Sequence, residues 1–181
     1  ADAKGVWITL KNITLDWDRT ALLRGVIDIT ELTAKEVSLP RAPVTTGANG
    51  LPIPEASGFS LPELPVSVRI AKFGITKIAV GADILGRDAV FSLKGSAKLE
   101  GGAGTVDFGV TRTDGPLGTF ALKGSFSNTT RQLSVNLDVA EGPNGIATNL
   151  LDLPGKPAVE LQIQGNGPIN DFAASVALRT D

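Results

Sequence analysis

Apolar and polar residues alternate along most of this chain with a period of two, which is typical of β-strands. The alternation is cleanest between residues 91 and 139 and returns at residues 159–163. In each run the apolar side chains occupy one side of the strand and the polar side chains occupy the other. We expect the apolar sides to form one continuous face. The candidate lining residues of this face are Phe91, Leu93, Leu99, Val106, Phe108, Val110, Phe120, Leu122, Phe126, Leu133, Val135, Leu137, Val139, Leu161 and Ile163.

The alternation in the N-terminal part changes phase several times. Val6, Ile8 and Leu10 alternate, and Ile13 then resumes the pattern one position out of step. Similar shifts continue as far as Leu39. A one-residue slip would turn every apolar side chain to the opposite face of a sheet. Because a β-bulge adds one residue and restores the facing, we expect a bulge or a tight bend at each shift.

Residues 40–65 interrupt the alternation and contain six of the eleven prolines. Proline has no N–H to donate to a sheet, and the glycines in the same stretch weaken strands further. The stretch therefore predicts a long surface loop. Two interpretations fit this loop: a mobile connection between strands, or a recognition segment in an extended conformation.

Short turn sequences separate most of the other strands. They include Gly101-Gly102, Ser127-Asn128 and Gly165-Asn166-Gly167-Pro168. Connections this short join antiparallel neighbours, since a parallel crossover needs a dozen or more residues. One short helix is predicted at residues 145–152, because apolar residues recur there at helical spacing and stop at a Pro-Gly pair.

The predicted fold is mostly β: a single unit over residues 1–181, built as an antiparallel meander with one short helix. Such a sheet must cover its apolar face, and one short helix cannot hide many strands. Two folds satisfy this condition. The sheet can curl into an elongated open trough, taco-like in section, whose apolar lining stays partly exposed. Alternatively, it can close into a β-sandwich.

The composition excludes most catalytic chemistry. The chain has no His, Cys, Met or Tyr, so the usual general base near neutral pH and the commonest metal ligands are missing. We find no catalytic constellation, and we expect neither enzymatic activity nor a cofactor or metal. Asp16 and Asp18 flank Trp17 on one side of a strand, where two carboxylates could hold a cation. No further oxygen ligands follow at a loop spacing, which favours a solvated strand edge.

Charge and side-chain type favour a passive apolar surface. Lys plus Arg number 17 against 19 Asp plus Glu without a basic cluster, so we expect no nucleic-acid partner. The 21 Leu, 14 Val and 12 Ile far outnumber the 7 Phe and 2 Trp, so the lining is mainly aliphatic. No apolar run is long enough to span a bilayer. The missing initiator Met and the alternation from Val6 predict a piece excised from a longer chain.

A more specific signature lies in the C-terminal half. It consists of Glu141-Gly142-Pro143-Asn144-Gly145-Ile146-Ala147, then Leu150-Leu151-Asp152-Leu153-Pro154-Gly155-Lys156-Pro157, then Gly165-Asn166-Gly167-Pro168-Ile169-Asn170-Asp171-Phe172. This series resembles a signature of the TamB family, the translocation and assembly module subunits among the AsmA-like, bridge-like lipid-transfer proteins. Residues 5–13, 15–17, 22–25 and 38–41 resemble early repeats of the same family.

The resemblance implies a fold, a location and a set of partners. Family members look like a periplasmic β-trough with a hydrophobic groove, anchored to the inner membrane by an N-terminal helix that this sequence lacks. They pair with the outer-membrane barrel TamA through a region outside this sequence. They are linked to autotransporter and other outer-membrane protein assembly, and they resemble proteins that pass phospholipid between membranes. The expected ligand is therefore a phospholipid or another acyl-chain molecule, with outer-membrane proteins as clients.

Two further function classes remain open at this stage. A chaperone-like scaffold would template client β-strands along an exposed sheet edge. A closed β-sandwich would act as a plain binding module. An open apolar face would favour the lipid groove, and a sheet without a continuous groove would favour the sandwich.

Overall fold

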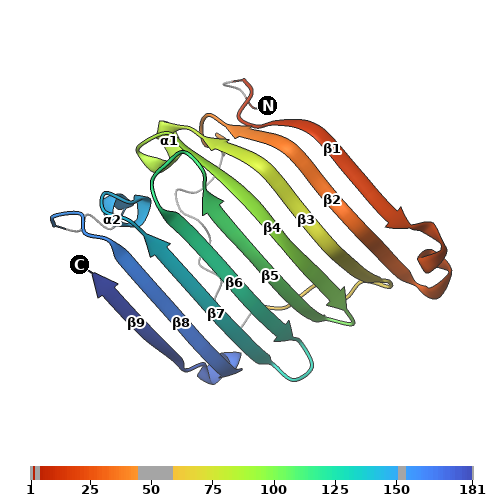
Figure 1. The fold of residues 1–181 in the computed structure, drawn as a ribbon. Coiled ribbons are helices and arrows are strands. Elements are labelled where there is room, and N and C mark those ends of the chain that lie inside the picture. The colour runs from red at the N-terminus through yellow and green to blue at the C-terminus, as the bar shows by residue number, and fades with distance from the viewer. Residues whose placement is uncertain (1, 3–4, 45–58, 151–153, 181) are drawn as a thin grey trace.

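The computed structural model describes residues 2, 5–44, 59–150 and 154–180, and it contains one open sheet of nine strands (Figure 1). The strands lie side by side in chain order. They are β1 (Thr9–Asp18), β2 (Val26–Leu39), β3 (Ser67–Val80), β4 (Ala89–Glu100), β5 (Ala103–Arg112), β6 (Gly118–Ser127), β7 (Gln132–Glu141), β8 (Val159–Pro168) and β9 (Ala174–Thr180). The prediction of a mostly β, open sheet is confirmed, and the closed β-sandwich is excluded for the described part of the chain.

Short helices lie between some of the strands. The predicted helix at residues 145–152 is present as α2 (Ile146–Leu150), which begins one residue after Gly145, while residues 151 and 152 of that range lie outside the described residues. The expectation of a single helix was wrong, because α1 (Ala82–Leu85) and the 3₁₀ helices η1 (Arg19–Arg24) and η3 (Ile169–Asp171) are also present. These elements are three to six residues long, too short for a hydrophobic period to show in the sequence.

The meander is not antiparallel throughout, because β2 and β3 pair in parallel. Their register runs without a shift from Val26 opposite Ser67 to Leu39 opposite Val80. A parallel neighbour requires a connection long enough to return the chain to the starting end of the sheet. The segment between Leu39 and Ser67, which contains the predicted loop at residues 40–65, is long enough for such a connection. Residues 45–58 of the predicted loop lie outside the described residues.

The predicted bulges keep the apolar residues of the N-terminal strands on one face. The register shifts between β1 and β2 at Asp16 and Trp17, and between β3 and β4 after Ile70 and after Ile75. The pairing of β2 with β3 is interrupted at corresponding places in the two strands, so their register does not shift. Ile29 therefore lies opposite Ile70. Strand β1 begins only at Thr9, so the alternation at Val6 and Ile8 lies outside the sheet.

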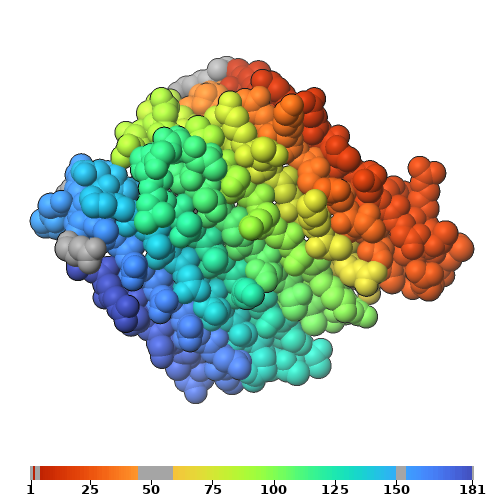
Figure 2. Space-filling view, viewed as in Figure 1, coloured from red at the N-terminus to blue at the C-terminus, as the bar shows by residue number. Residues whose placement is uncertain are grey.

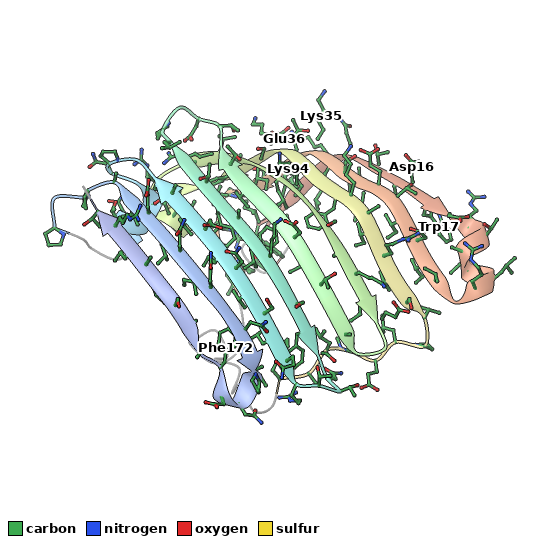
Figure 3. The ribbon with its side chains drawn as sticks, turned by 60° about the horizontal axis from the view of Figure 1, so that its bottom comes forward. Asp16, Trp17, Lys35, Glu36, Lys94 and Phe172 are labelled. Carbon is green, nitrogen blue, oxygen red and sulfur yellow. The ribbon has the colours of Figure 1, made fainter. Side chains whose placement is uncertain are left out.

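The opposite face of the sheet is polar and carries cross-strand ion pairs. Glu36 lies between Lys11 and Lys77, with Nζ to Oε distances of 3.1 and 3.2 Å. Glu36 and Lys94 project from the same side of the sheet in Figure 3, the side that faces the viewer in Figures 1 and 2. Exposed ion pairs of this kind contribute roughly 0–1 kcal/mol each to the free energy of unfolding. They therefore add little to the stability of the sheet, and they mark this face as the one in contact with solvent.

Candidate hydrophobic groove

Strand pairing brings all the candidate lining residues together on one face. One row across the sheet contains residues that lie directly opposite one another in neighbouring strands: Leu93, Val110, Phe120, Val139 and Leu161. The next row contains Phe108, Leu122, Leu137 and Ile163. Period-two alternation and short turns together fixed this arrangement, which is why the sequence alone could predict it.

This apolar face is open to a degree that a protein core would not be. Among the candidate lining residues, only Phe126 is buried, and all the others are half-buried. Apolar side chains at both sheet edges are still more exposed, including Ile13 at 59% and Val176 at 63%. A strand pattern that looks like a core in sequence therefore forms a partly solvated surface here.

Glycines on this face make room for neighbouring aromatic rings. A Cβ added at Gly165 would collide with the ring of Phe172, the residue labelled beside β8 and β9 in Figure 3. The predicted turn at Gly165-Asn166-Gly167-Pro168 was therefore wrong: these residues belong to β8, and η3 makes the turn. Glycine signals a turn and a close approach equally well, and only the structure separates the two.

At one end of the strands, α1 and α2 border a hollow of about 450 Å³ on the apolar face. The sheet contributes Phe91, Val110, Phe120 and Val139 to its lining, and the helices contribute Ile84, Leu85, Ile146 and Ala147. Glu141 holds α2 in place, because its carboxylate accepts hydrogen bonds from the N–H groups of Ile146 (3.1 Å) and Ala147 (2.6 Å). The helical residues of this wall were not predicted as part of the site.

A buried ion pair lies next to this hollow. The Arg112 side chain, 1% exposed, donates from Nε and Nη2 to the two carboxylate oxygens of Asp114 at 2.6 and 2.8 Å. These hydrogen bonds, more than the attraction of the charge, lower the pKa of Asp114 and raise the pKa of Arg112. Nη1 of Arg112 has no hydrogen-bond partner among the described residues. Gly118 lies beside Arg112, and because glycine has no side chain there is space for the methylene groups of the arginine.

Two more hollows continue the groove along the same face. One, of about 310 Å³, lies over β1 to β4 and is lined by residues that include Leu10, Ile13, Leu32, Ile70 and Phe73. The other, of about 360 Å³, lies over β4 to β7 and is lined by Leu99, Val106, Leu122, Leu133 and Val135, among others. Phe59 and Leu61 also line the second hollow. Their alternation just before Pro62 was the only signal for them in the sequence.

Of the two carboxylates that flank Trp17, the one on Asp18 caps a helix. Asp18 caps η1 by accepting hydrogen bonds from N–H (2.8 Å) and Oγ1 (2.6 Å) of Thr20, and these bonds lower the pKa of the Asp18 carboxyl group. In Figure 3, Asp16 and Trp17 lie on opposite sides of β1. Across the described residues, no group of three acidic side chains comes close enough to hold a metal ion.

Comparisons with known proteins add no identification. No family model, no curated protein and no solved structure matches this chain. Among the described residues, no helix has the length and apolar character needed to cross a membrane. The groove and its chemistry therefore carry the functional conclusion.

Proposed function

We propose that this chain binds the acyl chains of phospholipids in its open apolar groove and forms one segment of a bridge along which lipid passes between membranes. The observation that carries the proposal is the half-buried lining, which extends over one face of a single unclosed sheet. Large contiguous apolar surfaces are rarely left exposed in folded proteins, and ligand-binding grooves are among the sites that they mark. Transfer of hydrocarbon from water onto it is favourable by about 0.8 kcal/mol for each fully buried CH₂ group.

The lining suits a ligand that slides. Its side chains are mainly Leu, Val, Ile and Phe, which attract hydrocarbon without directional bonds. The resemblance to the TamB family supports extending the proposal to a periplasmic protein that works with the barrel TamA. In that setting the groove would supply phospholipid from the inner to the outer membrane and support the assembly of outer-membrane clients such as autotransporters.

A charge in the groove should weaken lipid binding strongly. We expect Val110→Asp to weaken the binding of a fluorescent fatty acid by about tenfold or more, because a carboxylate facing hydrocarbon loses its hydration. Fluorescence titration of the purified chain measures the effect. Thr111→Asp is the matched control, since Thr111 is the next residue of β5, lies on the polar face and pairs with Ser92 and Thr119.

The same titration separates a groove from a core. Val110→Asp should keep the β-sheet circular dichroism of the native chain, because Val110 is only half-buried. A native chain that binds no fatty acid would refute the proposed function. A Val110→Asp variant that unfolds while Thr111→Asp stays folded would assign Val110 to a closed core.

One observation favours the strand-templating scaffold as a second candidate function. All residues of β9 are exposed, and its pairing with β8 runs without a bulge. The other edge strand, β1, is distorted by its register shift and by Asn12 at a φ of 52°. Regular edges accept added strands, and bulged edges resist them. Photo-crosslinking from Ala177 to a client β-hairpin peptide would support templating, and crosslinking only from groove positions to lipid would argue against it.

A further inference from the structure

The end of the β2–β3 connection lies across the apolar face as a strap, defined here as residues 59–65. Figure 1 shows this segment passing behind the sheet, on the side away from the viewer. Its apolar residues Phe59 and Leu61 face the strands and line the hollow of about 360 Å³ together with Leu122 and Val135. The sequence left open whether this stretch was a plain connection or a recognition segment.

Polar groups of the β6–β7 turn hold the strap in place. The side-chain amide of Asn128 accepts a hydrogen bond from Leu61 N–H at 2.8 Å and donates one to the Leu61 carbonyl oxygen at 2.9 Å. This two-way bonding resembles the pairing of a neighbouring strand. Arg131 adds a third bond, donated from Nη1 to the Phe59 carbonyl oxygen at 2.6 Å.

The apolar side of the strap is seated along one rim of the sheet. The Phe59 ring meets the Phe126 ring edge-on, with centroids 5.1 Å apart, which explains why Phe126 is buried. Leu61 rests on Gly104, where an added Cβ would lie 2.8 Å from Leu61 Cδ1. The space beyond these contacts stays open towards Val106, Leu122 and Val135. The strap therefore stands at the rim without filling the groove.

We propose that the strap is one wall of an acyl-chain site, in which Phe59 and Leu61 contact the hydrocarbon directly. This rests on the proposed function and names the residues that enclose the ligand over β4 to β7. The helices α1 and α2 border the groove at the opposite ends of the strands, and the sheet is its floor. The ligand is a hydrocarbon chain, because Leu, Val and Phe supply most of the residues that line the hollow between strap and floor, alongside the polar residues Lys98, Thr105, Ser125 and Ser134.

A site-directed quenching experiment tests the wall directly. Phe59→Trp places an indole at the hollow, and bound dibromostearate should quench its fluorescence beyond the quenching measured in the native chain, which has two tryptophans. Leu64→Trp is the matched control, because Leu64 belongs to the same strap, is 42% exposed and does not line the hollow. Equal quenching at both positions would overturn the proposal.

Affinity gives the second readout. We expect Leu61→Ser to weaken dibromostearate binding by about fivefold to tenfold while Leu64→Ser leaves it unchanged, since loss of one apolar wall lowers contact area without closing the groove. Tighter binding by Leu61→Ser would mean that the strap competes with the ligand, and unchanged binding would mean that it does not touch it. Either result overturns the wall while the proposed function stands. Absence of binding to the native chain would refute the proposed function itself.

Discussion

Replacing Asp114 by alanine is expected to lower the free energy of unfolding by about 3 kcal/mol, because it leaves a buried guanidinium without its counter-ion. The Arg112 side chain is almost fully buried and donates two hydrogen bonds, both of them to the Asp114 carboxylate. The third nitrogen of the guanidinium, Nη1, has no hydrogen-bond partner among the described residues. No existing hydrogen bond would therefore compensate for the loss of Asp114. Urea denaturation followed by circular dichroism measures the change.

An exposed ion pair on the neighbouring strands provides the control for Asp114→Ala. Asp107 pairs with Lys123 at 3.2 Å, but both side chains are more than half exposed. Asp107→Ala should therefore change the free energy of unfolding by less than about 1 kcal/mol. Equal losses in the two variants would show that burial of Arg112 does not set the strength of its pair.

We expect the contribution of Asp114 to the free energy of unfolding to depend on pH. The hydrogen bonds from Arg112 place the pKa of Asp114 below its ordinary value of 3.8. A depressed folded-state pKa contributes stability above the unfolded-state pKa, and this contribution is lost as the pH falls through the folded-state pKa. The difference in unfolding free energy between the native chain and Asp114→Ala should shrink below about pH 4. A difference that stays constant from neutral pH to acid would contradict this origin.

Gly95→Ala is the second substitution expected to have a large effect, with a loss of about 3 kcal/mol from overpacking. A Cβ at Gly95 would lie 2.5 Å from the carbonyl oxygen of Asp107 and 2.6 Å from Cζ of Phe73. The oxygen belongs to the paired strand β5 and cannot move without breaking the ladder. The ring of Phe73 would also leave its place in the groove. Thermal and urea unfolding both report the loss.

Gly109 offers a matched control one strand away. It lies opposite Lys94 and Ala121 on the polar face, and the nearest atom to an added Cβ is 3.8 Å away. Gly109→Ala should keep or raise stability by roughly 0.5–1 kcal/mol, since alanine restricts the unfolded chain more than glycine does. If Gly95→Ala changed the free energy of unfolding no more than Gly109→Ala does, the expectation that Phe73 packs closely against the backbone at Gly95 would be wrong.

The pattern of the sequence predicted the apolar face over β4 to β8 residue by residue. Side chains two apart share a face, so Val106, Phe108 and Val110 had to lie together whichever strand was their neighbour. The phase shifts near Ile29 and Ile70 required bulges for the same reason, and the register shows them. The identity of the residues on the groove floor is thus a local property of the chain.

Three features depended on contacts between residues far apart in sequence. Alternation is equally compatible with either direction of a neighbouring strand, so the parallel pairing of β2 and β3 left no trace in it. In the sequence, a glycine such as Gly165 indicates a turn. In the structure, the ring of Phe172 packs against it. The sequence of the strap indicates a loop, and its hydrogen bonds with Asn128 and Arg131 hold it against the sheet.

The sequence by itself determined which side chains are apolar, which of them share a face, and that no His, Cys, Met or Tyr is available for catalysis. It did not determine whether the face is covered. Burial depends on what packs against a surface from elsewhere in the chain, and among the described residues only short helices and the strap line the hollows of this face from outside the sheet. Only the tertiary structure decided that an aliphatic pattern usually found in a core forms an open groove.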